Sequence, residues 1–115
     1  MNEMTDCSMN FQRGLRHCDG QVNIYQAVLK AFCEQYANRL CQHHSIASDG
    51  LYQELHALKG LSATIGAQSL SELTESAFKN WTSMSDDSRI KALGSIQFEL
   101  SQVLDEIKEY LTQNN

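Results

Sequence analysis

The last third of the chain constrains its fold most strongly. Apolar residues there recur alternately three and four positions apart, which keeps one face of an α-helix apolar over many turns. The series is Leu93, Ile96, Leu100, Val103, Ile107 and Tyr110, widened by Ile90, Leu104 and Leu111. Strands need alternation at every second residue, so this stretch predicts one long amphipathic helix. The absence of proline from all 115 residues favours uninterrupted helices throughout.

The same spacing predicts further helices upstream of this one. Met9, Phe11 and Leu15 indicate a short helix of about two turns that ends before the turn dipeptide Asp19-Gly20. Longer helices are predicted over about 21–41, 49–65 and 67–82. Their apolar positions are Tyr25, Val28, Leu29, Phe32, Tyr36 and Leu40, then Leu51, Leu55, Leu58, Ser62 and Ile65, then Leu70, Leu73, Ala77 and Trp81. The predicted N-caps are Ser48 or Asp49 for the third helix and Ser85 or Asp86 for the last.

Four long amphipathic helices with short connections bury their apolar stripes most economically on one another. We therefore expect an all-α fold, an antiparallel up-down four-helix bundle with the short N-terminal helix capping one end. The length suits a single domain over residues 1–115, with about residues 1–8 frayed.

Charge and composition narrow the partners. The formal net charge is −5 and the nine Lys and Arg residues are scattered, which argues against nucleic acid. Neither a signal peptide nor an apolar run of about 20 residues is present, so we expect a cytoplasmic domain without membrane contact. The cysteines match no CxxC pattern and are expected to be reduced and structural. They are Cys7, Cys18, Cys33 and Cys41.

Most catalytic motifs are missing. The glycines form no phosphate-binding loop, and there is no nucleophile elbow. His43-His44 is the one candidate for a metal, but adjacent residues diverge on any regular element and no HExxH accompanies them. We therefore predict a solvated pair, no metal site and no cofactor, and a metal-binding bundle remains a weaker hypothesis.

The predicted helix over 49–65 carries an unusual outer flank. Opposite its apolar stripe lie Tyr52, His56, Lys59, Gly60 and Ala63. Lys59 and Gly60 follow His56 by three and four residues, and we expect all three to be exposed on one helical face. A mid-helix glycine costs about 1 kcal/mol relative to alanine. Close approach of another protein to the imidazole would explain it.

These residues resemble a known signature. The sequence HALKGLSATIGA at residues 56–67, followed by Leu70 and Leu73, is similar to the HxLKGxSxxxGAxxLxxL pattern of histidine-containing phosphotransfer (HPt) domains of bacterial phosphorelays. The resemblance implies a monomeric bundle whose histidine accepts a phosphoryl group from the aspartate of a receiver domain and passes it to another receiver. It also implies a phosphotransfer domain without kinase or nucleotide-binding activity of its own.

Carried over by position, the resemblance implies a role for each residue of the signature. His56 would be the phosphoacceptor, Lys59 would stabilise the charge of the phosphoryl oxygens, and Gly60 would give the receiver clearance. Ser62 and Gly66 would be structural, and the receiver would supply Mg²⁺. Pairing specificity is expected in side chains around the presented face. The predicted docking residues besides Gly60 are Tyr52, Gln53, Ala63 and Gln68.

Related classes fit less well. A sensor-kinase dimerisation domain would have an acid after the histidine and a proline soon after, whereas Ala57 follows here. The chemotaxis-kinase version shares HxxKG, but its additional acid and histidine partners are not evident. The expected setting is the C-terminal module of a hybrid sensor kinase, with a parent protein possibly anchored in the inner membrane, rather than a free-standing protein. The alternative function is a helical interaction module that docks a receiver or kinase without carrying phosphate.

Overall fold

The computed structural model describes residues 8–37 and 49–113, and over these ranges the chain is helical with no β-strand. The predicted all-α class is therefore confirmed. The elements are α1 (Phe11–His17), α2 (Val22–Gln35), α3 (Asp49–Ile65), α4 (Gln68–Asn80), the 3-10 turn η2 (Trp81–Ser83) and α5 (Asp86–Gln113).

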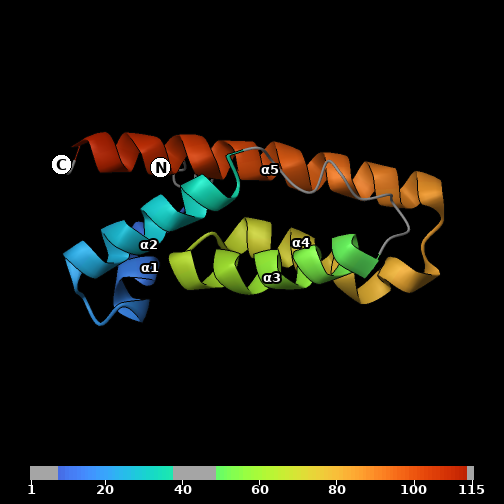
Figure 1. Cartoon of the computed structure of the whole chain (residues 1–115), viewed down its shortest axis with the longest axis horizontal. Helices are drawn as coiled ribbons and strands as arrows, with labels where there is room; N and C mark the ends of the chain where they lie inside the picture. Colours follow the sequence, from blue (N-terminus) through green and yellow to red (C-terminus); the bar gives the residue numbers. More distant parts are fainter. Residues whose placement is uncertain (1–7, 38–48, 114–115) are drawn as a thin grey trace, which may run out of the picture.

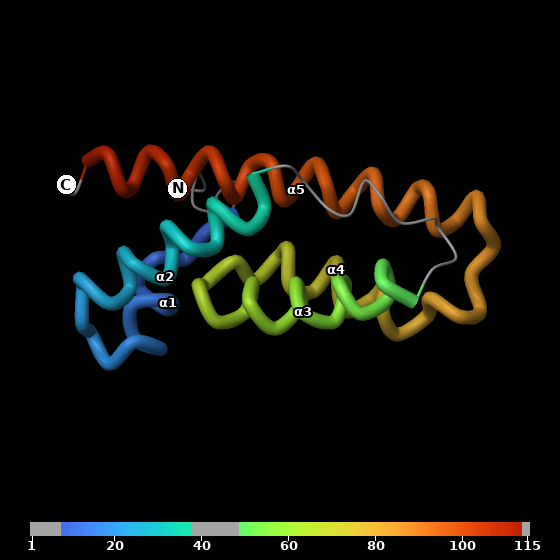
Figure 2. Tube along the Cα trace, in the orientation of Figure 1, coloured from blue at the N-terminus to red at the C-terminus, as the bar shows by residue number. Residues whose placement is uncertain are grey.

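Helix α5 runs along the length of the molecule, and the other helices lie on one side of it (Figure 1). Helices α3 and α4 lie side by side and pack extensively on each other, and α4 also packs against α5. The trace reverses direction between α3 and α4 and again after η2 (Figure 2). Helices α1 and α2 lie together at one end, where α1 contacts α3 and α2 contacts both α3 and α5.

Helix α5 starts with the predicted cap. The Ser88 backbone N–H donates to Ser85 Oγ at 3.1 Å, and Asp86 and Asp87 occupy the positive first turn. The apolar series also lies where the spacing placed it. Ile96, Leu100, Val103 and Ile107 are buried, and Leu93 and Tyr110 are half-buried against the core.

Helix α3 buries the predicted stripe. Its buried residues are Leu51, Leu55, Leu58, Ser62 and Ile65, the five that the spacing placed on one face. They join a core that draws Tyr25, Leu29 and Phe32 from α2, Leu70 and Ala77 from α4, and the buried face of α5. The opposite face of α3 is left for contacts outside the core.

Two predicted interior positions are wrong. Ile90 is 58% exposed, whereas Arg89 beside it is half-buried and donates its Nε–H to the Trp81 carbonyl at 2.9 Å. Leu73 is 38% exposed, whereas Thr74 is fully buried. The Thr74 hydroxyl can be buried because it donates to the Leu70 carbonyl at 2.7 Å within α4.

Two predicted helix ends also differ. Helix α2 ends at Gln35 instead of about residue 41, and Tyr36 makes the closing contact through its N–H to the Phe32 carbonyl at 3.1 Å. Apolar spacing continued past this point because Tyr36 stays buried after the backbone has left the helix. The helix predicted over 67–82 is split into α4 and η2.

Several predictions fall outside the described residues. They are residues 1–7 of the segment expected to be frayed (about 1–8), residues 38–41 of the predicted second helix, the His43-His44 pair, the Ser48 cap, Cys7 and Cys41. Cys18 and Cys33 are free thiols, as expected for these two. Within residues 8–37 and 49–113, none of the helices has the length and apolar character needed to cross a bilayer.

Candidate functional site

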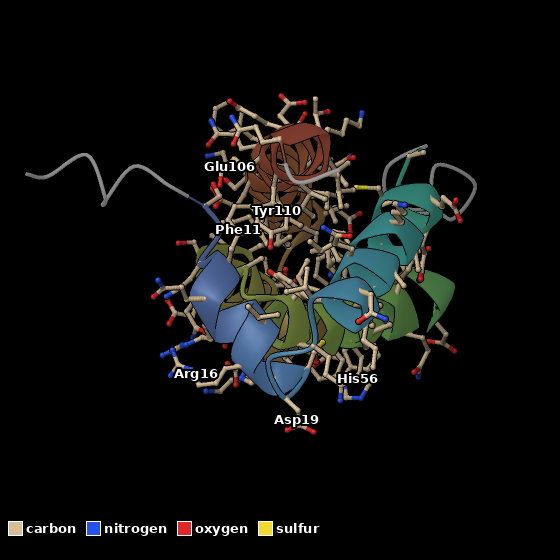
Figure 3. The ribbon with its side chains drawn as sticks, turned by 90° about the vertical axis from the view of Figure 1, so that its left-hand side faces the viewer. Phe11, Arg16, Asp19, His56, Glu106 and Tyr110 are labelled. Carbon is tan, nitrogen blue, oxygen red and sulfur yellow. The ribbon has the colours of Figure 1, made fainter. Side chains whose placement is uncertain are left out.

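Helix α3 presents His56 to solvent. Leu55 and Leu58 on either side of it are completely buried and fix the rotation of the helix, so that His56 lies on the opposite, exposed face. Figure 3 shows the imidazole on the outer side of the molecule, pointing away from α5. The side chain is thus open to an incoming protein.

The His56 ring is held by an aromatic contact. It lies 5.0 Å from the Phe78 ring, centroid to centroid, at an interplanar angle of 37°. Phe78 comes from the end of α4 and is half-buried. Neither imidazole nitrogen has a hydrogen-bond partner among residues 8–37 and 49–113. Both ring nitrogens are therefore available for chemistry in the described structure.

Lys59 brings a positive charge to the same ring. Its Nζ lies 5.3 Å from the Phe78 centroid, within cation–π range. The Lys59 backbone carbonyl accepts a hydrogen bond from the buried Ser71 hydroxyl at 3.0 Å, which ties this turn of α3 to α4. The sequence predicted an exposed lysine, but Lys59 is half-buried. Its ammonium lies over the Phe78 ring, which the His56 imidazole also contacts.

Gly60 leaves an open space beside the imidazole. A Cβ added at this position would meet no atom of the described residues within 4 Å outside its own helix, so packing in this part of the chain does not require glycine here. The gap faces solvent because Gly60 is exposed. A partner surface can approach the helix backbone at this turn more closely than at any side-chain-bearing position.

Gly66 ends α3 in a Schellman motif. Its φ is +96°, the Gly66 N–H donates to Ala63, and the Ala67 N–H donates to the Ser62 carbonyl at 2.8 Å. A Cβ at Gly66 would collide with the Asn10 carbonyl of the α1 N-cap. The Ser62 side chain is fully buried, and its hydroxyl has no partner among the described residues.

The last carbonyls of α3 are capped from outside. Asn10 N–H donates to Gly66 at 2.8 Å, His17 Nδ1 to Thr64 at 2.9 Å, and the Tyr25 hydroxyl to Ile65 at 2.7 Å. Carbonyls at a helix end lack hydrogen-bond partners within the helix. These three donors therefore supply partners to three consecutive carbonyls at the C-terminal end of α3. Burial, reinforced by Tyr110 and Cys18, raises the pKa of Tyr25, which keeps this hydroxyl a donor. The helix carrying His56 is thereby anchored at its C-terminal end.

The predicted docking residues differ in how much of each side chain is available to a partner. Gln53 is exposed and Ala63 is half-buried, and both belong to the outer side of α3. Tyr52 stacks on Phe78 at 4.4 Å, so much of its ring is used within the chain. Gln68 begins α4, where it accepts from Arg13 at 3.1 Å and donates to Glu72 at 3.0 Å.

Sequence reasoning missed Phe78 and His17. Phe78 lies seven residues after Ser71, so both fall on the side of α4 that faces α3, but the spacing within α4 does not reveal what they touch. The pattern singled out the core positions of α4 instead. His17 was not among the predicted site residues, and its bond to Thr64 joins residues that are far apart in the chain.

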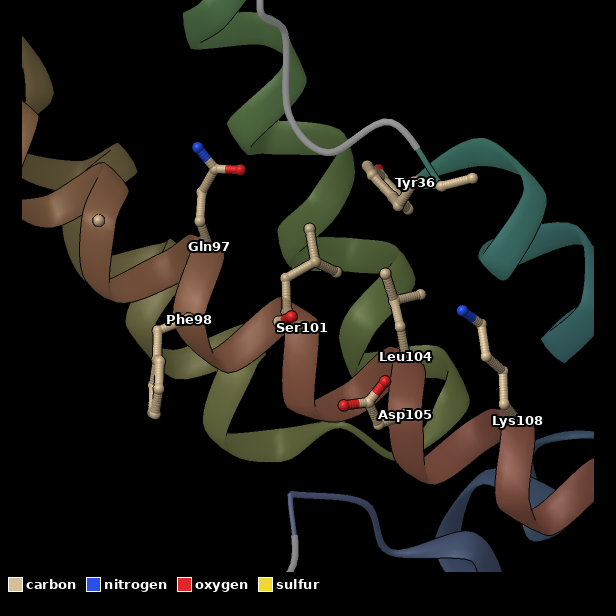
Figure 4. A pocket seen from close by; sticks show the side chains of 10 residues that line it. Tyr36, Gln97, Phe98, Ser101, Leu104, Asp105 and Lys108 are labelled. Carbon is tan, nitrogen blue, oxygen red and sulfur yellow. The ribbon is translucent and has the colours of Figure 1, made fainter.

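One hollow on the described surface lacks the predicted site residues. A depression between the end of α2 and α5 is lined by residues that include Tyr36, Gln97, Leu104 and Lys108, and none of the predicted site residues lines it (Figure 4). No three His, Cys, Asp or Glu side chains gather as metal ligands in the parts of the chain that the structure describes. His56 with Lys59 and Gly60 is the candidate site.

Comparisons with known protein families, with curated proteins and with solved structures returned no match for this chain.

Proposed function

We propose that this chain is a phosphorelay intermediate, in which His56 accepts a phosphoryl group from the aspartate of a receiver domain and passes it to another receiver. One observation carries the proposal. A solvent-exposed imidazole without a hydrogen-bond partner in the described structure shares the Phe78 ring with the Lys59 ammonium. Acceptor and cation are thus gathered on one open face.

The transfer needs little else from this chain. The unprotonated nitrogen of a neutral imidazole attacks the phosphorus of the aspartyl phosphate, so that a P–N bond forms and the P–O bond breaks with its electron pair left on the receiver carboxylate. The N–H proton on the other ring nitrogen then passes to water. Catalysis of such a transfer rests mainly on positioning and on stabilising the phosphoryl charge. Lys59 can provide part of that charge from this chain, and the receiver would bring Mg²⁺.

The surroundings of His56 support docking by a protein. Gly60 leaves the helix backbone open one turn from the ring, and Gln53 is exposed on the same face. The finer fold that fits this function is an antiparallel bundle of α2, α3, α4 and α5, capped by α1. A monomer would suffice, because His56, Lys59 and Gly60 all belong to one helix.

Potassium phosphoramidate, a small donor of phosphoryl groups to histidine, tests the acceptor directly. Intact-mass spectrometry should find one added phosphoryl group that is labile in acid and stable in base. His56→Gln should abolish it. His17→Gln is the matched control, because His17 is also exposed but its Nδ1 is bonded to Thr64.

A second step tests the relay itself. The phosphorylated chain is mixed with receiver domains encoded in the same genome, and phosphate should move onto a receiver aspartate. Phosphorylation that persists undiminished in His56→Gln would refute the assignment. A chain that binds a receiver but never carries phosphate would be the alternative, a helical interaction module.

A further inference from the structure

Phe78 contacts three successive turns of the presented face of α3. Its ring stacks on Tyr52 at 4.4 Å and 18°, lies 5.0 Å from the His56 ring, and has the Lys59 ammonium 5.3 Å from its centroid. These three residues lie on the flank of α3 that sequence spacing had set opposite the core. One side chain from α4 therefore contacts three of the side chains on this flank.

For His56 this contact replaces hydrogen bonding as the orienting force. No described residue hydrogen-bonds to the imidazole, so its rotamer depends on what the ring packs against. A tilted aromatic pair at this separation is a favourable geometry, and it restricts rotation of both rings. The ring nitrogens stay free while the plane of the ring is held.

For Lys59 the same ring provides a cation–π contact that a stronger interaction can replace. A cation over an aromatic face is attracted by the ring quadrupole. A charge-assisted hydrogen bond to a phosphoryl oxygen is stronger, so the ammonium can leave Phe78 when phosphate arrives. The Ser71 bond to the Lys59 carbonyl holds the backbone during that movement.

We propose that Phe78 is the positioning residue of the site, orienting the imidazole of His56 for attack and holding the Lys59 ammonium beside it until the phosphoryl group is transferred. This inference rests on the proposed function. Phe78 differs from the buried residues of α4, such as Leu70 and Ala77, because it is half-buried and packs at the edge of the core.

The test compares Phe78→Leu, which removes the aromatic face, with Phe78→Tyr, which keeps it. Phe98→Leu is the matched control, since Phe98 is 67% exposed on α5. Rates of His56 phosphorylation by potassium phosphoramidate are measured against donor concentration, and thermal unfolding is followed in parallel. NMR of the His56 ring protons and the Lys59 side chain reports whether both residues lose their contact with the aromatic ring of Phe78.

Phe78→Leu should lower kcat by about tenfold with KM little changed, because the acceptor is misoriented rather than hidden. In the same variant the His56 and Lys59 resonances should both shift. Phe78→Tyr should restore the rate to within about twofold, and Phe98→Leu should match the wild-type chain. A purely structural role for Phe78 would lower the melting temperature without this kcat loss and rescue.

The outcomes separate the two proposals. A wild-type chain that takes no phosphate would remove the proposed function and this inference with it. A wild-type chain phosphorylated at His56, with Phe78→Leu equally fast, would overturn the inference and leave the function standing. A rate that stays low in Phe78→Tyr would also overturn it, because the aromatic face alone would then not be sufficient.

Discussion

Replacing Gly60 should change stability and function in opposite directions. In the described structure a Cβ at Gly60 has open space around it, and the residue lies within α3, whose end is five residues away at Ile65. Alanine therefore gains helix propensity and reduces the freedom of the unfolded chain, without a clash. The expected gain is about 0.5–1 kcal/mol in the free energy of unfolding. For a chain of this size, the gain raises Tm by about 2–4 °C.

The functional cost is expected from a longer side chain. Gly60→Gln puts a flexible group into the gap one turn from His56, where a docking receiver would have to approach. Transfer to the receiver should slow by at least about tenfold, equivalent to about 1.4 kcal/mol. Phosphorylation by phosphoramidate should not change, because a small donor needs no such clearance. The difference between the two donors isolates docking from chemistry.

Gly94 provides the matched control. It lies inside α5 and is exposed, and an added Cβ would meet no atom of the described residues within 4 Å outside its own helix. Gly94→Ala should raise Tm by a similar amount, and Gly94→Gln should leave receiver transfer unaltered. Two results would refute the reasoning. One is destabilisation by Gly60→Ala, and the other is normal receiver transfer in Gly60→Gln.

Two further predictions concern the scaffold. Gly66→Ala should lower the free energy of unfolding by roughly 2–4 kcal/mol, because φ is +96° and the methyl group would strike the Asn10 carbonyl; a urea titration with an unchanged midpoint would contradict this. Stability should also fall as pH rises from about 10 towards 12, since burial, with the Glu54 charge, raises the pKa of Tyr36 to about 12 and burial raises that of Tyr25. The folded state then binds more protons than the unfolded chain, whose tyrosines ionise near pH 10, so the tyrosinate absorbance of these residues should appear together with unfolding.

Local patterns were sufficient for the helices and for the orientation of α3. The residues that spacing grouped into one stripe are the five that α3 buries, and His56 lies opposite them. This worked because burial of a helix face depends on the periodicity of its own sequence. The same logic failed at Leu73, which has the right spacing but is exposed. Thr74 beside it is buried instead, because the Thr74 hydroxyl donates to a backbone carbonyl within the helix.

Local sequence patterns did not predict which residues of different helices contact each other. Gly14 falls within the predicted first helix, and its spacing does not reveal that its close approach to the Ile65 carbonyl leaves no room for a Cβ. His17 and Tyr25 cap the end of α3 from forty or more positions away. Nothing in the local sequence specifies these bonds, because each depends on where two helices meet.

The presented face of α3 shows both what the sequence determines and what the tertiary structure adds. The sequence by itself determined that the chain is helical, and that His56, Lys59 and Gly60 share a face of one helix away from its apolar stripe. Only the tertiary structure decided that Phe78 of α4 lies beneath that face and that Lys59 rests half-buried on it. The physical reason is that helical spacing is a property of consecutive residues, whereas the orientation of an imidazole depends on the atoms that a second helix brings against it.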